Sequence, residues 1–211
     1  MKTLKVLLTA ILVMTTGTLI AAEPTEEEKL LAVQRIDIID KPALMIGMGL
    51  TQRMSDDYYI AALYLEENVQ FDGTDVFLYE PVVRRMEFRI ASTSSVSARS
   101  FARKLAEGIR INNARDDISL QKAQVARLMR FFRGTYKKGD VLRFDYHNSF
   151  GTRVSLNDRV LGEIPRSNDM YKLLIKVWVG ERPPSSRFKE GIMGKNEPEY
   201  AVNLLKKFVA L

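Results

Sequence analysis

The segment 136–183 has the most regular pattern of apolar and polar positions in the chain. Its alternating apolar residues are Leu142, Phe144, Tyr146, Val154 and Leu156. Small and polar residues around Gly151 and at Asn157 interrupt this alternation twice, as turns between short strands do. The pattern predicts an antiparallel meander of three strands, followed by an amphipathic helix that ends at Gly180.

The segment 33–92 is rich in further β-strand patterns. We expect an edge strand over residues 33–39, a second strand over 43–53, a buried central strand over 58–67 and a fourth strand over 82–92. The second strand contains Gly47 and Gly49, which indicate a bulge or a close approach of another backbone. A dinucleotide-binding loop is the other interpretation, but the third glycine and a following helix are missing.

Helical spacing begins at Ser94. One apolar stripe contains Ala98, Phe101, Leu105 and Ile109, and later helices are expected from Asp116 and over residues 198–211. Strands, two helices, three strands and further helices together predict the α+β class. The expected architecture is one antiparallel sheet with helices packed on one face.

Several ordered motifs resemble those of bacterial chalcone isomerase-like proteins, in particular their secreted branch. They are Gly139-Asp140, Phe144-Asp145-Tyr146, Gly151-Thr152, Leu156-Asn157 and the helix end Leu-Leu-Ile-x-x-Trp-Val-Gly at 173–180. The resemblance covers roughly residues 40–195. It implies an open-faced β-sandwich of the chalcone isomerase type over a domain spanning 23–211.

The same resemblance implies that the isomerase chemistry is absent. Plant chalcone isomerases carry an arginine after the Gly-x-Gly motif, and a tyrosine and other polar groups that stabilise the oxyanion formed during ring closure. By alignment, those positions are Thr51, Phe101, Gly108 and Val177 here. We therefore predict no catalytic residues and no isomerase activity towards chalcones.

The leading functional hypothesis is the binding of a small apolar or fatty-acid-like ligand, by resemblance to the fatty-acid-binding branch of the fold. The expected site is a cleft between the strands 43–66 and the helix that carries Phe101. Two alternatives are an interaction protein that acts through its surface and an isomerase with an unknown substrate. An apolar cleft would favour binding, whereas a filled one would favour the interaction protein.

Arg53 is the predicted anchor for an acidic ligand. It lies two residues beyond Thr51, which is one full period of a strand, so both side chains would leave the sheet on the same face. Thr51 or Tyr59 would then supply a further hydrogen bond to a carboxylate. The alternative is a strand-end arginine that is solvated or paired with a neighbouring aspartate.

The first 22 residues have the layout of a cleaved signal peptide. Lys2 and Lys5 precede an apolar run that ends at Ala21-Ala22, before an acidic segment. A membrane anchor is the alternative, but the run is short and contains four threonines. We expect periplasmic localisation and no stable membrane insertion after the leader is removed.

Composition excludes several chemistries. The chain has no Cys and one His, His147, so disulfides, thiol nucleophiles and cysteine zinc sites are excluded and no metal site or cofactor is predicted. The segment 99–138 contains eleven Lys or Arg and three acidic residues. Such helices could suit an anionic surface, nucleic acid or membrane, but we interpret the charges as the solvent-facing sides of soluble helices and predict no nucleic-acid partner.

Overall fold

The structure is a computed structural model that describes residues 25–73, 81–165 and 168–211. The predicted leader, residues 1–22, lies outside the described residues. Within those three ranges, no helix is long and apolar enough to cross a membrane.

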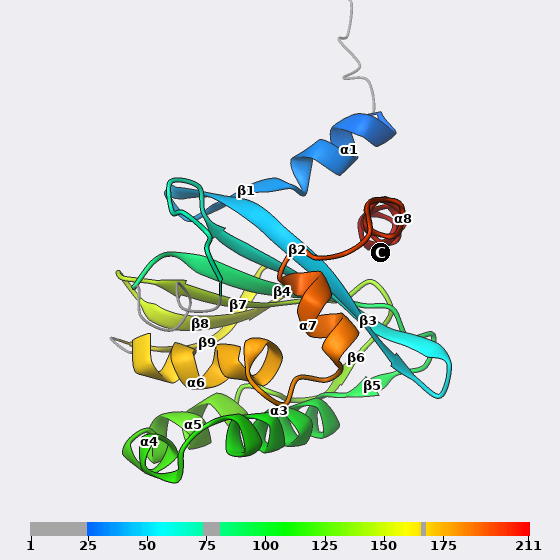
Figure 1. Ribbon diagram of the computed structural model, residues 1–211. Helices are drawn as coiled ribbons and strands as arrows, with labels where there is room; N and C mark the ends of the chain where they lie inside the picture. The colour runs from blue at the N-terminus through cyan, green and yellow to red at the C-terminus, as the bar shows by residue number, and fades with distance from the viewer. Residues whose placement is uncertain (1–24, 74–80, 166–167) are drawn as a thin grey trace, which may run out of the picture.

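The described residues form one curled, seven-stranded antiparallel sheet with a layer of helices beside it (Figure 1). In sheet order, the strands are β1 (Arg35–Ile38), β2 (Lys41–Arg53), β3 (Asp56–Glu66), β4 (Arg84–Ile90), β7 (Val141–His147), β8 (Gly151–Leu156) and β9 (Arg159–Ile164). The short strands β5 (Val96–Ser97) and β6 (Thr135–Tyr136) pair separately. The predicted α+β class is confirmed.

The helices surround this sheet unequally. They are α1 (Glu26–Ala32), α3 (Ala98–Asn112), α4 (Arg115–Leu120), α5 (Lys122–Met129), α6 (Asn168–Val179), α7 (Ser186–Ile192) and α8 (Pro198–Val209). In Figure 1, α6 lies below the sheet, and α3, α4 and α5 lie below α6. The C-terminal α8 packs on the opposite side of the sheet, an addition to the expected arrangement, in which helices cover one face only.

Alternation along the central strands separates two faces of the sheet. On the helical face, which points toward α3 and α6, the main core contains Leu63, Phe88, Phe144 and Trp178. On the outer face, a smaller core joins Ile60, Ala62 and Tyr64 of β3 to Leu204 and Phe208 of α8. Successive residues of a strand point to opposite faces, so β3 contributes to both cores.

The predicted meander and helix are present. β7, β8 and β9 pair in order, and the β8–β9 turn places Asn157 and Asp158 at φ 48° and 66°. Asparagine and aspartate tolerate this left-handed conformation better than most residues, which explains the tight turn. Trp178 of α6 is 2% exposed and lies 4.9 Å from the ring of Phe88 between centroids, so it anchors the helix to the sheet.

The two glycines of β2 mark a close approach of α7. A Cβ atom at Gly47 would lie 2.3 Å from the carbonyl oxygen of Gly191, and one at Gly49 would lie 2.7 Å from the Phe188 ring. The strand pairing also shifts between Met45 and Gly47. Both parts of the prediction, a bulge and a close approach, are therefore confirmed.

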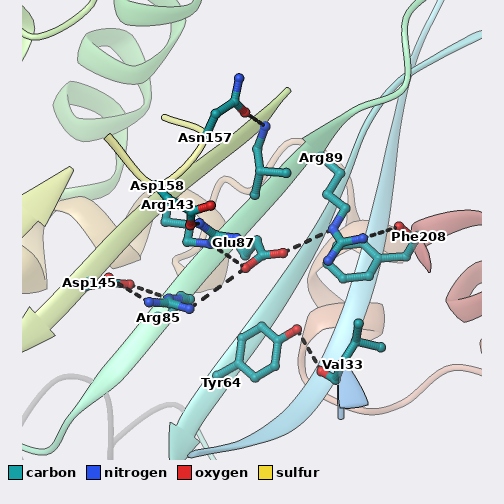
Figure 2. Close-up of polar contacts among 11 residues, drawn as sticks. Val33, Tyr64, Arg85, Glu87, Arg89, Arg143, Asp145, Asn157, Asp158 and Phe208 are labelled. Atoms are coloured by element: carbon teal, nitrogen blue, oxygen red, sulfur yellow. Dashed lines mark hydrogen bonds and ion pairs between the residues drawn. The ribbon is translucent and has the colours of Figure 1, made fainter. Parts of the chain in front are cut away.

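The outer face of β4 and β7 carries a compact network of paired charges (Figure 2). The Glu87 carboxylate accepts hydrogen bonds from Arg89 (3.1 Å) and Arg143 (2.8 Å), and its side chain is 4% exposed. Arg85 donates two hydrogen bonds to Asp145, at 2.6 and 2.9 Å. Burial acts to lower the pKa of Arg85, but Asp145 outweighs it and leaves that pKa raised.

Arg89 joins this network to α8. Its Nη1 atom donates to the backbone oxygen of Phe208 at 2.8 Å, and its guanidinium lies 4.0 Å from the centroid of the Phe208 ring. Figure 2 shows this arginine between the Glu87 carboxylate and α8. The C-terminal helix is therefore held by apolar burial and by a cation–π contact together.

His147 is the last residue of β7 and is 9% exposed. Its Nε2 atom lies 3.0 Å from Oδ1 of Asp40, and its Nδ1 atom lies 2.7 Å from the Ser149 hydroxyl. The backbone N–H of Ser149 also donates to Nδ1. This histidine links the β1–β2 turn to the β7–β8 turn.

Candidate functional site

A cavity of about 850 Å³ lies between α3, the β2–β3 hairpin and the end of α6. Its wall consists of Thr51, Gln52, Tyr58, Tyr59, Phe101, Arg103, Lys104, Leu105, Ala106, Glu107, Gly108, Arg110, Ile111, Val177, Trp178, Arg182, Pro183 and Pro184. The volume falls within the range of small-molecule pockets in proteins. This is the cleft that the sequence predicts between the strands 43–66 and the helix of Phe101.

The inner wall is aromatic and apolar. The rings of Tyr59 and Phe101 meet edge to face at 6.3 Å between centroids, and Phe88 contacts both of them as well as Trp178. Leu105 and Val177 are buried beside these rings. Interlocked rings of this kind form a rigid apolar surface that suits a hydrocarbon.

Three residues with hydroxyl groups, Thr51, Tyr58 and Tyr59, interrupt the apolar wall. Thr51 and Tyr59 face each other across β2 and β3, and their hydroxyl groups lie near each other. The two groups do not form a hydrogen bond. The buried Thr51 Oγ1 atom has no hydrogen-bond partner among the described residues. Burial raises the pKa of Tyr59 to about 12, so this phenol is neutral and can donate a hydrogen bond at any physiological pH.

Gly108 and Val177 pack directly against each other. A Cβ atom at Gly108 would lie 2.5 Å from a methyl carbon of Val177, so the glycine allows α3 to approach α6 closely. By alignment, these two positions carry polar groups in plant chalcone isomerases. Here they form a helix–helix contact in the cavity wall, and neither of them offers a donor to a ligand.

The rim of the cavity is positively charged. Arg103, Lys104, Arg110 and Arg182 are exposed there, beside a single carboxylate, Glu107. Arg110 donates two hydrogen bonds to Glu107, at 2.6 and 2.8 Å, and these bonds hold the pKa of that carboxyl below its usual range. Cations therefore outnumber acids at the opening, and the rim favours an anionic group.

Arg53 does not line this cavity. It borders a separate depression of about 320 Å³, together with Asp56, Asp57 and several serines near the start of α3. The pairing of β2 with β3 shifts between Thr51 and Gln52, with Tyr58 as the extra residue of β3, and Arg53 lies beyond this shift at the end of the hairpin. Thr51, Tyr59 and Phe101 therefore come together in one cavity, and Arg53 lies outside it.

The residues that sequence reasoning missed are those of the rim and of the far wall. Lys104 lies about one turn after Phe101 on α3, where the helical period could have placed it at the edge of the apolar stripe, whereas Arg103 borders the cavity from the solvent side of the helix. Arg182 follows α6 in an irregular segment, and no local pattern in the sequence places it beside α3. The sequence identifies Trp178 only as part of the helix-end motif, but it also lines the cavity.

The fold and this cavity define an open-sheet protein with an apolar-walled cavity beside α3. The chalcone isomerase-like family model matches residues 32–194, so the chain belongs to the chalcone isomerase-like family. Comparison with curated proteins gives no match.

A solved structure with the same fold is that of the fatty-acid binding protein AtFAP1 from Arabidopsis thaliana. The TM-score is 0.56 at 10% sequence identity, and the alignment covers 82% of this chain and 92% of that protein. A likeness at this level of identity establishes the fold.

Proposed function

We propose that the protein binds a small apolar ligand with an acidic head group, such as a fatty acid, without catalysing a reaction on it. The observation that carries the proposal is the cavity itself, with buried aromatic walls inside and exposed cations at its rim. The fatty-acid binding protein of the same fold supports this class of ligand.

The distribution of charge indicates how such a ligand would lie. A carboxylate deep in the cavity would be desolvated beside neutral hydroxyl groups only, which is unfavourable for an ion. At the rim, Arg103 or Arg182 can bind it with paired hydrogen bonds. The hydrocarbon chain would then fill the space between Phe101, Leu105 and Trp178.

Titration with a fluorescent fatty acid tests this proposal. Ala106 lines the cavity from a partly exposed position on α3, so Ala106→Trp should fill the space without disturbing the core and weaken binding by at least about tenfold. Ala126→Trp is the matched control, because it places the same ring on an exposed position of α5 outside the cavity. Equal affinities for the two variants would contradict binding in this cavity.

The head-group anchor is tested separately. Replacing arginine by Met keeps much of the side-chain volume and removes the charge, so Arg103→Met should weaken binding of the fatty acid more than that of its methyl ester. Arg53→Met examines the anchor that was predicted from the sequence. If Arg53→Met alone discriminates between acid and ester, the head group lies at the smaller depression.

We also propose that the protein is secreted to the periplasm after cleavage near Ala22. The proposal rests on the charge and hydropathy pattern of the first 22 residues. N-terminal sequencing of protein recovered from the periplasm of expressing bacteria should begin beyond residue 22. A sequence that begins at Met1 would contradict cleavage.

A further inference from the structure

The helices α3, α4 and α5 and the segment that follows them, residues 98–138, form a strongly basic surface, named here the basic layer. Eleven Lys and Arg side chains in this range are all exposed, against three acidic residues. They are Arg99, Arg103, Lys104, Arg110, Arg115, Lys122, Arg127, Arg130, Arg133, Lys137 and Lys138.

These cations are almost entirely unpaired by acids. Among the described residues, Arg110 is the only one of the eleven that forms a salt bridge, and that bridge to Glu107 is solvent-exposed. On the outer face of the sheet, by contrast, Arg85, Arg89 and Arg143 all contact carboxylates. The field of the basic layer therefore extends into solvent, where it attracts anionic partners.

The cations of α3 form a stripe that points away from the sheet. Arg99, Arg103 and Arg110 are spaced by four and seven residues, so they share one side of the helix. Phe101 and Leu105 occupy the opposite, buried side. Figure 1 shows α3 with α4 and α5 as the layer farthest from the strands, so this stripe is available to a broad surface.

An exposed apolar side chain lies within the same layer. Leu120 ends α4 and is 82% exposed, and exposed Lys122 follows at the start of α5. Asp116 and Asp117 precede this leucine by one helical turn, but cations predominate in the layer as a whole. An exposed leucine within such a layer suits the interface of an anionic bilayer, where the cations meet lipid phosphates and the leucine enters the acyl boundary. Contacts to the phosphates of a nucleic acid would gain nothing from that leucine.

We propose that the basic layer docks reversibly on the surface of an anionic phospholipid bilayer. The cations Arg103, Lys104 and Arg110 belong both to this layer and to the rim of the cavity, so docking would bring the cavity mouth to the lipid interface. Exchange of a ligand with the bilayer would follow. That exchange rests on the proposed ligand binding, but the docking itself does not.

Flotation with lipid vesicles, in the absence of any fatty acid, tests the docking. The processed protein should bind vesicles of phosphatidylcholine with 30% phosphatidylglycerol at low salt and fail to bind pure phosphatidylcholine. The double variant Arg99→Gln, Arg103→Gln should lose affinity by roughly fivefold for each cation removed. The matched control is Lys195→Gln, Lys206→Gln, which removes two exposed cations outside the basic layer and should bind as the parent does.

Three results would overturn the proposal. Equal losses in the two double variants would show that net charge alone attracts the vesicles. Equal binding to neutral vesicles would show that apolar insertion, for example of an uncleaved leader, replaces the basic layer. The third result is that the protein binds duplex DNA as tightly as it binds vesicles, and that Leu120→Ser changes neither affinity. This result would show that the basic layer binds polyanions in general. Fatty-acid titration without vesicles assesses the proposed function independently of each result.

Discussion

The two sides of the molecule hold their arginines in opposite chemical situations. On the outer face of the sheet, Arg85, Arg89 and Arg143 are largely buried, and each contacts a carboxylate. In the basic layer, the arginines are exposed, and nearly all lack such a partner among the described residues. The charges of the outer face are neutralised within the molecule, whereas the exposed charges of the basic layer can bind an anionic partner.

The largest expected effect concerns the core between the sheet and its helices. Trp178→Ala removes a buried indole that contacts Phe88 and Phe144, so the free energy of unfolding should fall by about 3–5 kcal/mol. Urea denaturation measures this change. A loss below about 1 kcal/mol would show that the helical face does not depend on this residue.

The next effect compares a buried charge with an exposed one. Glu87→Gln removes the carboxylate that Arg85, Arg89 and Arg143 share and leaves the largely buried Arg89 without an acidic partner, so we expect a loss of about 3 kcal/mol of stability. Glu107→Gln is the matched control, because its bridge to Arg110 is exposed and should contribute nothing measurable. Equal denaturation midpoints for both variants would remove the distinction between the two regions.

Alkaline pH should reduce stability through buried tyrosines on both faces. Burial raises the pKa of Tyr59 to about 12 and also raises the pKa values of Tyr64, Tyr136 and Tyr171 above the ordinary value of 10. Each group keeps its proton in the folded state while the unfolded chain loses it. Their contribution is therefore complete below about pH 10 and is lost as the pH rises towards 12.

Arg84 has the opposite effect on the pH dependence of stability. Burial between the rings of Tyr146 and Tyr171 lowers its pKa to about 10, so its contribution to stability rises above that pH. A single arginine does not offset four tyrosines. Urea denaturation from pH 8 to 12 should show the decline, and Tyr59→Phe should lessen it by on the order of 2 kcal/mol at the upper end. Stability that is constant up to pH 12 would contradict these shifts.

The last prediction is that the protein has no effect on the rate of chalcone cyclisation. The purified protein should not accelerate chalcone cyclisation above the background rate. The resemblance places Thr51, Phe101, Gly108 and Val177 where plant chalcone isomerases carry polar groups, and the cavity wall inside the rim carries only neutral polar groups. Absorbance measurements with a natural chalcone test this. A saturable increase in rate would show that the cavity does stabilise an oxyanion.

The local parts of the fold could be predicted from the sequence because each depends on neighbouring residues. The meander, the α6 helix and the approach at Gly47 and Gly49 all follow from short-range patterns. The placement of Arg53 could not, because the boundary between the cavity and the smaller depression depends on where α3 packs against the hairpin, which no local pattern specifies. The position of α8 was also missed, because an amphipathic helix does not indicate which face of a sheet it will cover.

The contact between Gly108 and Val177 limits how this cavity can change over evolutionary time. A larger residue at position 108 requires a smaller one at 177, because a single added carbon would already overlap the valine. The two positions are therefore epistatic: a polar side chain gained at 108 alone should destabilise the protein before it could assist any reaction. A lineage that acquires isomerase chemistry on this scaffold would have to open position 177 first.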